Sequence, residues 1–313
     1  MTLGEQERQL LDNMAAAGPA EAEPLQVATL RERYAALAEL VPRGPEVDSS
    51  DRTVPGPAGP VPVRIYSPPT VEAVGVLLYL HGGGWTIGDL DTHDHPCRTL
   101  CHDGSVVVVS VDYRLAPEHP FPAALDDARA VLDWVAAHTA DLGVASGRIA
   151  VGGDSGGGNL AAVLALMARD SGDPTLAFQL LVYPAVDLRA NSVERYPSLR
   201  ENATGYLLTL EHMELFIGNY RPDPALGEDW RLSPLLAPDH SGLPPALVIT
   251  AGFDPLRDEG HAYAETLSSA GVEVVHRHYP ETVHTMWQLA PFLDAGQRAL
   301  ADAAEVLKET LTR

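Results

Sequence analysis

A serine between glycines is the residue of this chain whose surroundings most clearly point to chemistry. Ser155 stands at the centre of Gly153-Asp154-Ser155-Gly156-Gly157, which fits the pattern Gly-x-Ser-x-Gly. The run 148–152 predicts a buried strand, and the run 159–167 predicts a helix. Between a strand and a helix this turn is so tight that glycines must flank the serine, which then stands at the carboxyl edge of a sheet as a nucleophile. The pattern alone also fits a plain glycine turn that opens a helix.

A serine hydroxyl is a weak nucleophile at neutral pH, so it needs a base and a group that orients the base. Asp254 follows the predicted strand 246–250, and Pro255 disfavours helix at the aspartate. His284 lies in a loop between a predicted strand and the last helix. The chain order Ser, Asp, His is the order expected for a serine on such a turn. Asp254 is therefore the candidate acid and His284 the candidate base, with a plain helix N-cap and a solvated loop histidine as the alternatives.

A glycine run supplies the fourth element. His81-Gly82-Gly83-Gly84-Trp85 directly follows the predicted strand at 76–80. When serine attacks a carbonyl, the carbonyl oxygen becomes an oxyanion that backbone N–H groups must stabilise. Gly82, Gly83 and Gly84 let the backbone approach that oxygen, and Gly156 supplies a further amide beside the nucleophile. The sequence leaves open which two of the loop glycines donate.

These residues lie among strands and helices that alternate along most of the chain. The predicted strands are 61–66, 74–80, 106–111, 149–152, 178–183, 246–250 and 272–276, with turns and a short edge strand within 46–60. The predicted helices are 122–138, 158–169, 257–270 and 292–311. The alternation predicts an α/β fold with a mainly parallel sheet between layers of helices, which binds its ligand at the carboxyl ends of the strands.

Two regions depart from this alternation. Residues 1–45 predict two amphipathic helices around a breaker at 17–24, and residues 188–242 hold no convincing core strand but an apolar, helix-like stripe at 206–217. We expect one domain over residues 1–313, with 1–45 and 188–225 forming a cap over the active site. The candidate substrate-binding side chains are Trp85, Leu207, Met213, Phe216 and Trp287. For the cap residues among them, packing within the cap is the alternative.

Composition excludes several other classes of protein. The net charge of −22 disfavours nucleic acid and anionic membrane surfaces as partners. No run approaches the length of a membrane-spanning helix, and no leader pattern opens the chain, so we expect a cytoplasmic protein. With only two cysteines, Cys97 and Cys101, we expect no disulfide framework.

Some polar residues near these elements need another interpretation. The group His93, His95, Cys97, Cys101 and His102 matches no standard zinc spacing, so we expect a structural helix there and no metal. Asp154 lies beside the nucleophile on a sharp turn where adjacent side chains diverge, so we expect it to hydrogen-bond structurally. Glu118 is expected to support the loops beneath the site.

Together these residues closely resemble the hormone-sensitive lipase-like family of carboxylesterases, the bacterial family IV esterases. The glycine run at 81–84 is similar to the family's namesake motif, and 112–118, 183–184 and 254–258 are similar to further family signatures. The resemblance covers about residues 45–310. It implies an α/β-hydrolase fold, with about eight strands and a helical cap.

The resemblance also implies Ser155, Asp254 and His284 as a catalytic triad, without metal or organic cofactor. It implies small to medium acyl esters as substrates, and often a homodimer. Two positions depart from the family pattern. Gly156 stands where alanine is usual, and Thr285-Met286-Trp287 stands where glycine and an aromatic residue usually follow the histidine, so Trp287 is the candidate replacement for that aromatic.

The sequence therefore predicts a serine carboxylesterase that hydrolyses short- to medium-chain esters through an acyl-enzyme. An amidase, peptidase or lactonase with the same triad is the first alternative, because only the pocket distinguishes these reactions. A non-catalytic small-molecule receptor on an esterase scaffold is the second alternative. A lipase acting at lipid interfaces is the third, and it would require an exposed apolar lid.

Overall fold

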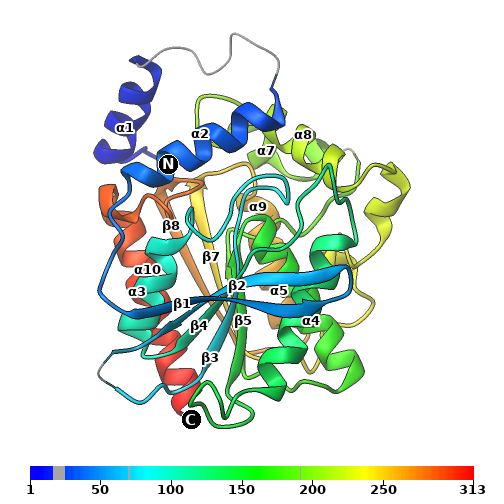
Figure 1. Cartoon of the computed structure of the whole chain (residues 1–313). Helices are drawn as coiled ribbons and strands as arrows, with labels where there is room; N and C mark the ends of the chain where they lie inside the picture. The colour runs from blue at the N-terminus through cyan, green and yellow to red at the C-terminus, as the bar shows by residue number, and fades with distance from the viewer. Residues whose placement is uncertain (17–24, 70, 191) are drawn as a thin grey trace.

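Eight strands form one sheet through the centre of the molecule (Figure 1). The computed structural model describes residues 1–16, 25–69, 71–190 and 192–313. The strands are β1 (Asp48–Gly56), β2 (Gly59–Ser67), β3 (Val76–Leu80), β4 (Val107–Val111), β5 (Ile149–Asp154), β6 (Phe178–Val182), β7 (Ala246–Phe253) and β8 (Val274–Val283). Their order across the sheet is β1-β2-β4-β3-β5-β6-β7-β8. The pairs β1–β2 and β2–β4 are antiparallel and every pair from β4 to β8 is parallel, so the predicted mostly parallel α/β-hydrolase sheet is confirmed.

Alternate side chains of the central strands point into two separate cores. In β3, Val76, Leu78 and Leu80 belong to one buried cluster, whereas Leu77 and Tyr79 belong to the other. This alternation follows from the two-residue repeat of an extended chain. Because both faces of β3, β4 and β6 are covered, these strands are buried along their whole length.

Five long helices cover the two faces of the sheet. The first core contains side chains of α4 (Ala123–Ala137), α5 (Gly156–Ser171) and α9 (Arg257–Ser269). The second core contains side chains of α3 (Asp94–Gly104) and α10 (Asp294–Thr312). Cys97 and Cys101 are buried on α3 as free thiols.

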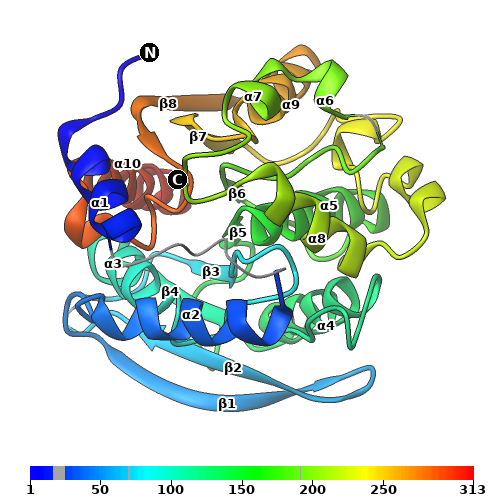
Figure 2. The same ribbon diagram turned by 90° about the horizontal axis from the view of Figure 1, so that it is seen from above.

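The N-terminal helices lie at one end of the molecule, together with the helices of the region 188–242 (Figures 1 and 2). They are α1 (Glu5–Ala16) and α2 (Val27–Leu40), and the breaker predicted at 17–24 lies outside the described residues. None of the residues of α2 is fully buried. The described residues of 188–242 form no strand, as predicted. Their short elements are α6 (Ser192–Arg195), α7 (Pro197–Glu201), α8 (Leu210–Tyr220), η1 (Pro224–Glu228) and η2 (Pro234–Leu236).

Two of the predicted segments have different bounds in the structure. The stripe 206–217 becomes helical only from Leu210, because Thr209 and His212 form a capping box that starts α8 there. Strand β8 begins at Val274 and continues to Val283, well past the predicted end at 276, because β7 extends beside it to Phe253. None of the described helices combines the length and the apolar character that crossing a membrane requires.

Candidate active site

Ser155 occupies a sharp turn between β5 and α5. Its backbone angles are φ 55° and ψ −119°, a combination that residues with a side chain rarely adopt. The Ser155 amide donates to Val182 O at 2.9 Å, and the Ala185 amide donates to Ser155 O at 3.3 Å. These two bonds tie the turn to the end of the neighbouring strand β6, which holds the strained conformation in place.

The glycines of the turn are required by close packing against β3. A Cβ atom on Gly153 would lie 2.3 Å from Leu80 O, and one on Gly157 would lie 2.0 Å from the same oxygen. Neither neighbour can move easily, because that oxygen belongs to the backbone of a buried strand. Only glycine therefore fits on either side of the serine, and the turn presses directly on the strand that leads into the glycine run.

The structure brings Ser155, Asp254 and His284 together in one chain of hydrogen bonds. His284 Nε2 lies 3.1 Å from Ser155 Oγ, and His284 Nδ1 lies 2.8 Å from Asp254 Oδ2. The second oxygen of Asp254 accepts a hydrogen bond from the Leu256 amide at 2.8 Å. Relative exposures of 8%, 0% and 5% for serine, aspartate and histidine place all three away from bulk water.

The order of the strands explains this meeting. Ser155 follows β5, Asp254 follows β7 and His284 follows β8, and these strands are parallel with β6 between them. Their carboxyl ends therefore share one edge of the sheet. The ring of Tyr183, directly after β6, lies 4.4 Å from the His284 ring, and Asn202 Nδ2 donates to Asp254 O at 3.1 Å.

The amides of the glycine run differ in whether they already have a hydrogen-bond acceptor. The Gly82 amide donates to Asp154 Oδ1 at 3.0 Å, so the expectation that Gly82 could serve an oxyanion is wrong. Gly83 and Gly84 have φ values of 115° and 57°, which only glycine adopts easily. Across the described part of the chain, the amides of Gly83, Gly84 and Gly156 have no hydrogen-bond acceptor. These three donors remain available for a developing negative charge.

Gly156 and Thr285, the two positions that depart from the family pattern, both have structural consequences. A Cβ atom on Gly156 would lie 3.2 Å from the Trp85 ring and 3.3 Å from the Trp85 amide nitrogen, so alanine there would be tight. Thr285 has φ 69°, the left-handed region that disfavours a β-branched residue. The loop that carries His284 is therefore strained where glycine is usual.

The candidate pocket side chains separate into two groups. Trp85, Met213 and Phe216 belong to one core cluster, and the Phe216 ring covers Gly84 so closely that a Cβ atom there would lie 2.4 Å from it. Leu207 is half-buried beside the other cluster. Trp287 is completely buried in that second cluster, so it presents no surface to a substrate and the expectation for it is wrong.

Asp154 accepts hydrogen bonds from several neighbouring groups. Asp154 accepts hydrogen bonds from Tyr79 Oη at 2.6 Å and from the Gly82 amide, which confirms its structural role. Burial raises the pKa of Asp154, but His93 and the hydrogen bonds from Tyr79 and Gln288 outweigh this, so that the pKa lies below its ordinary value.

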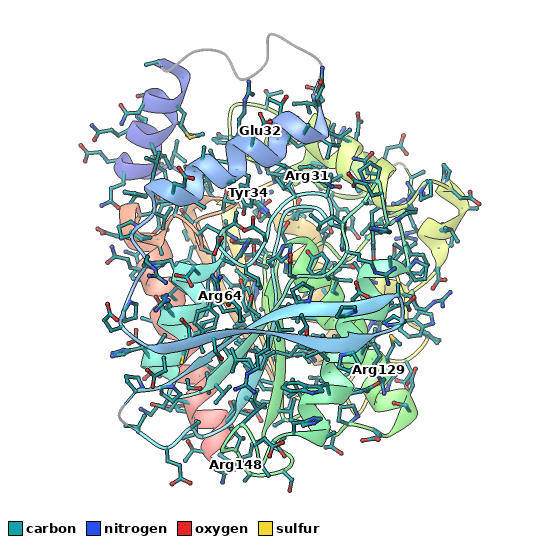
Figure 3. The ribbon with its side chains drawn as sticks, in the orientation of Figure 1. Arg31, Glu32, Tyr34, Arg64, Arg129 and Arg148 are labelled. Carbon is teal, nitrogen blue, oxygen red and sulfur yellow. The ribbon has the colours of Figure 1, made fainter. Side chains whose placement is uncertain are left out.

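Glu118 is exposed and binds the N-terminal helix instead of supporting loops beneath the site. Its carboxylate accepts two hydrogen bonds from Arg31 of α2, at 2.8 and 2.7 Å. Arg31 also donates to Thr86 O at 2.9 Å and to Ala116 O at 3.0 Å. In Figure 3, Arg31 and Tyr34 lie on the side of α2 that faces the rest of the molecule. One guanidinium therefore links α2 to the loop that follows the glycine run.

The group of histidines and cysteines considered as metal ligands lies on and before α3, as predicted. The described residues contain no group of three or more His, Cys, Asp or Glu side chains arranged to hold a metal ion. His95 Nδ1 lies 2.8 Å from Pro42 O, and His102 pairs with Asp103 at 2.7 Å, so these two side chains point to different neighbours.

The sequence interpretation missed Gln288 and Arg31, and it placed Tyr183 within a family signature without giving the side chain a role. Gln288 lies four residues after His284, and this position in the base loop was the available signal. Arg31 gave no signal, because a charged residue on an amphipathic helix is by default expected in solvent.

Comparison with known proteins gives consistent results. The profile of a family described as alpha/beta hydrolase fold matches residues 77–288. The carboxylic ester hydrolase LipN of Mycobacterium tuberculosis is 46% identical over 284 residues, which cover 87% of this chain and 74% of the relative. The carboxylesterase NlhH of the same species is 45% identical over 85% of this chain and 84% of its own. Ethyl acetate hydrolase of Pseudomonas putida is 39% identical over 80% and 79% of the two chains.

Solved structures agree with this similarity. The hyperthermophilic esterase from the archaeon Pyrobaculum calidifontis superposes with a TM-score of 0.94 at 41% identity, covering the whole of both chains. The thermostable carboxylesterase EstE1, cloned from a metagenomic library, superposes with a TM-score of 0.88 at 40% identity, covering 92% of this chain and 99% of its own.

Proposed function

The chain belongs to the hormone-sensitive lipase-like family of carboxylesterases within the α/β-hydrolase fold, and we propose that Ser155, Asp254 and His284 are its catalytic triad. It is a carboxylic ester hydrolase. The observation that carries the assignment of the triad is the unbroken chain of hydrogen bonds from Ser155 Oγ through the His284 ring to Asp254.

Acylation begins when Ser155 Oγ attacks the carbonyl carbon of the ester and His284 Nε2 accepts the serine proton. Asp254 holds His284 in the tautomer that leaves Nε2 free to accept, and it stabilises the cation that forms. The carbonyl oxygen becomes negative and receives hydrogen bonds from the amides of Gly156 and of Gly83 or Gly84. His284 then protonates the alkoxy oxygen, the alcohol leaves and the acyl group remains on Ser155.

Deacylation repeats these steps with water as the nucleophile. His284 Nε2 accepts a proton from water, and the resulting hydroxide attacks the acyl carbonyl. The oxyanion forms at the same amides, so one set of donors serves both halves of the reaction. Collapse of the intermediate returns the proton to Ser155 Oγ and releases the carboxylic acid.

We propose that the described residues of 1–45 and 188–225 act as the cap of this enzyme, and that α8 within it limits the acyl group. The Phe216 ring lies directly against Gly84, so a long acyl chain could not extend past the oxyanion donors without moving α8. Esters with short to medium acyl chains fit best into the space that the Phe216 ring leaves beside Gly84. The relative named ethyl acetate hydrolase supports a short-chain preference. A homodimer and a cytoplasmic location remain predictions of the sequence.

The test is a series of p-nitrophenyl esters from acetate to palmitate, assayed with the wild-type enzyme and Ser155→Ala. We expect turnover to peak at short chains and kcat to fall on the order of 10⁶-fold in the variant. Activity of the variant within tenfold of wild type would show that Ser155 is not the nucleophile. Turnover of amides or lactones without turnover of esters would favour those alternatives.

A further inference from the structure

Gln288 lies in the base loop, yet its side chain points away from the base and into a buried polar cluster. Its Nε2 atom lies 2.5 Å from Asp154 Oδ2 and 2.7 Å from His93 Nε2. Its Oε1 atom accepts a hydrogen bond from Tyr183 Oη at 3.2 Å. Because an ionised carboxylate only accepts hydrogen bonds, the amide nitrogen of Gln288 must face Asp154. The residue is 5% exposed, so water does not replace these contacts.

The carboxylate of Asp154 connects Gln288 to the glycine run. While Oδ2 accepts from Gln288, Oδ1 accepts from the Gly82 amide at 3.0 Å and from Tyr79 Oη at 2.6 Å. Gly82 directly precedes the two glycines whose amides are free. The orientation of the peptide groups that follow Gly82 therefore depends on a carboxylate that Gln288 helps to hold.

The Gln288 side chain is also connected to the His284 ring through Tyr183. Tyr183, which donates to Gln288, places its ring 4.4 Å from the ring of His284. His284 and Gln288 belong to one short loop, so a shift of Gln288 moves the base through the backbone as well as through this ring.

We propose that Gln288 is a positioning residue that holds the base loop and the oxyanion donors in fixed relation through Asp154. The inference rests on the proposed function of Ser155, Asp254 and His284. Without the amide, Asp154 loses a donor in a site that water does not reach, so the carboxylate and Gly82 must rearrange. A displacement of about 1 Å at a reacting group costs on the order of 10²-fold in rate.

The first variant is Gln288→Met, which keeps the length of the side chain and removes the amide. We expect kcat for p-nitrophenyl acetate to fall by about 10- to 100-fold with KM within about threefold, because substrate binding is not altered. The matched control is Gln179→Met. Gln179 is also a buried glutamine, but it lies on β6 and donates to Pro244 O, away from the site. We expect this control to lose stability without losing kcat.

The second variant, Gln288→Glu, gives a readout that a merely structural role would not produce. Two facing carboxyl groups repel when both are ionised and share a proton at lower pH, when one again donates to the other. We expect the kcat of this variant, relative to wild type at the same pH, to rise at least about fivefold from pH 8 to pH 6. This measurement also decides the question if Gln288→Met does not fold.

Two results would overturn the inference. One is a folded Gln288→Met enzyme with kcat within twofold of the Gln179→Met control. The other is a Gln288→Glu enzyme whose relative kcat does not change with pH. Ser155→Ala, assayed in parallel, separates the two proposals: if that variant is inactive while Gln288→Met is normal, only the positioning role fails, whereas an active Ser155→Ala refutes the triad.

Discussion

Arg31 should contribute a large part of the attachment of α2 to the body of the enzyme. The apolar side chains of this helix, Leu30, Tyr34 and Leu37, pack against the two cores but are only partly buried, so they hold the helix less firmly than a fully buried face would. Arg31 instead donates to two backbone carbonyl groups and to Glu118. Replacing it with methionine keeps an apolar side chain of similar length and removes every one of these hydrogen bonds.

The size of the effect follows from the exposure of the partners. The Arg31 and Glu118 side chains are 32% and 54% exposed, so solvent screens their ion pair and it contributes at most about 1 kcal/mol. The bonds to Thr86 O and Ala116 O are partly buried and contribute about 1 kcal/mol each. Arg31→Met should therefore weaken docking of α2 by about 2–3 kcal/mol, which raises the undocked population by about 30- to 150-fold.

Amide hydrogen exchange of the residues of α2 measures this population. We expect exchange in Arg31→Met to be about 30- to 150-fold faster than in wild type. Glu118→Gln should accelerate it by about fivefold or less, because the two carbonyl bonds remain. Glu32→Gln, an exposed position on the same helix, is the matched control. Equal exchange in Arg31→Met and Glu32→Gln would refute the argument, and an effect of Glu118→Gln as large as that of Arg31→Met would refute the assignment to the carbonyl groups.

Further predictions concern the triad, the turn, the base loop and pH. Asp254→Asn should lower kcat on the order of 10⁴-fold with little change in KM in steady-state assays, and a loss below tenfold would contradict its orienting role. Gly157→Ala, whose added Cβ would lie 2.0 Å from Leu80 O, should destabilise the fold by more than about 4 kcal/mol in urea titrations, and a normal midpoint would be incompatible with the packing described. Thr285→Gly should relieve the left-handed strain and raise the free energy of unfolding by up to about 1 kcal/mol, so an unchanged or lower value would argue against strain there. Burial lowers the pKa of His81 to about 4, so the unfolded chain takes up a proton at this residue between about pH 6.5 and pH 4 while the folded protein does not. The free energy of unfolding should therefore fall by about 3 kcal/mol as the pH decreases through this window. If a His81→Gln variant shows the same dependence of stability on pH, His81 is not the cause.

The triad could be predicted because each of its members leaves a local trace in the sequence. Ser155 needs glycines around it, Asp254 stands shortly after an apolar run that predicts a strand, and His284 lies before the last helix in the chain order that the turn requires. The parallel order of those strands then brings the three residues together without any further information. The positions of β3, β4 and β6, which are mostly apolar and buried along their whole length, also agree closely with the prediction.

What the sequence did not reveal depends on contacts between distant segments. The exclusion of Gly82 from the oxyanion donors follows from one hydrogen bond to Asp154, 72 residues away. The link between Arg31 and Glu118 spans 87 residues, and neither residue lies in an apolar pattern that would suggest contact. Trp287 is an aromatic residue beside the base, but which side of the loop it occupies is decided by packing in the second core.

The two thiols buried on α3 allow local or global unfolding of this enzyme to be measured through their reaction with a thiol reagent. Cys97 and Cys101 are the only cysteines of the chain, and both are completely buried. Burial raises the pKa of Cys97 well above its ordinary value and that of Cys101 to about 12, so almost no thiolate exists in the folded protein at pH 8. A thiol reagent can therefore react only with molecules in which α3 has separated from the sheet. The rate of the thiol reaction in the folded protein, divided by the rate for an unfolded thiol, then gives the fraction of molecules in which α3 has separated from the sheet, without any denaturant.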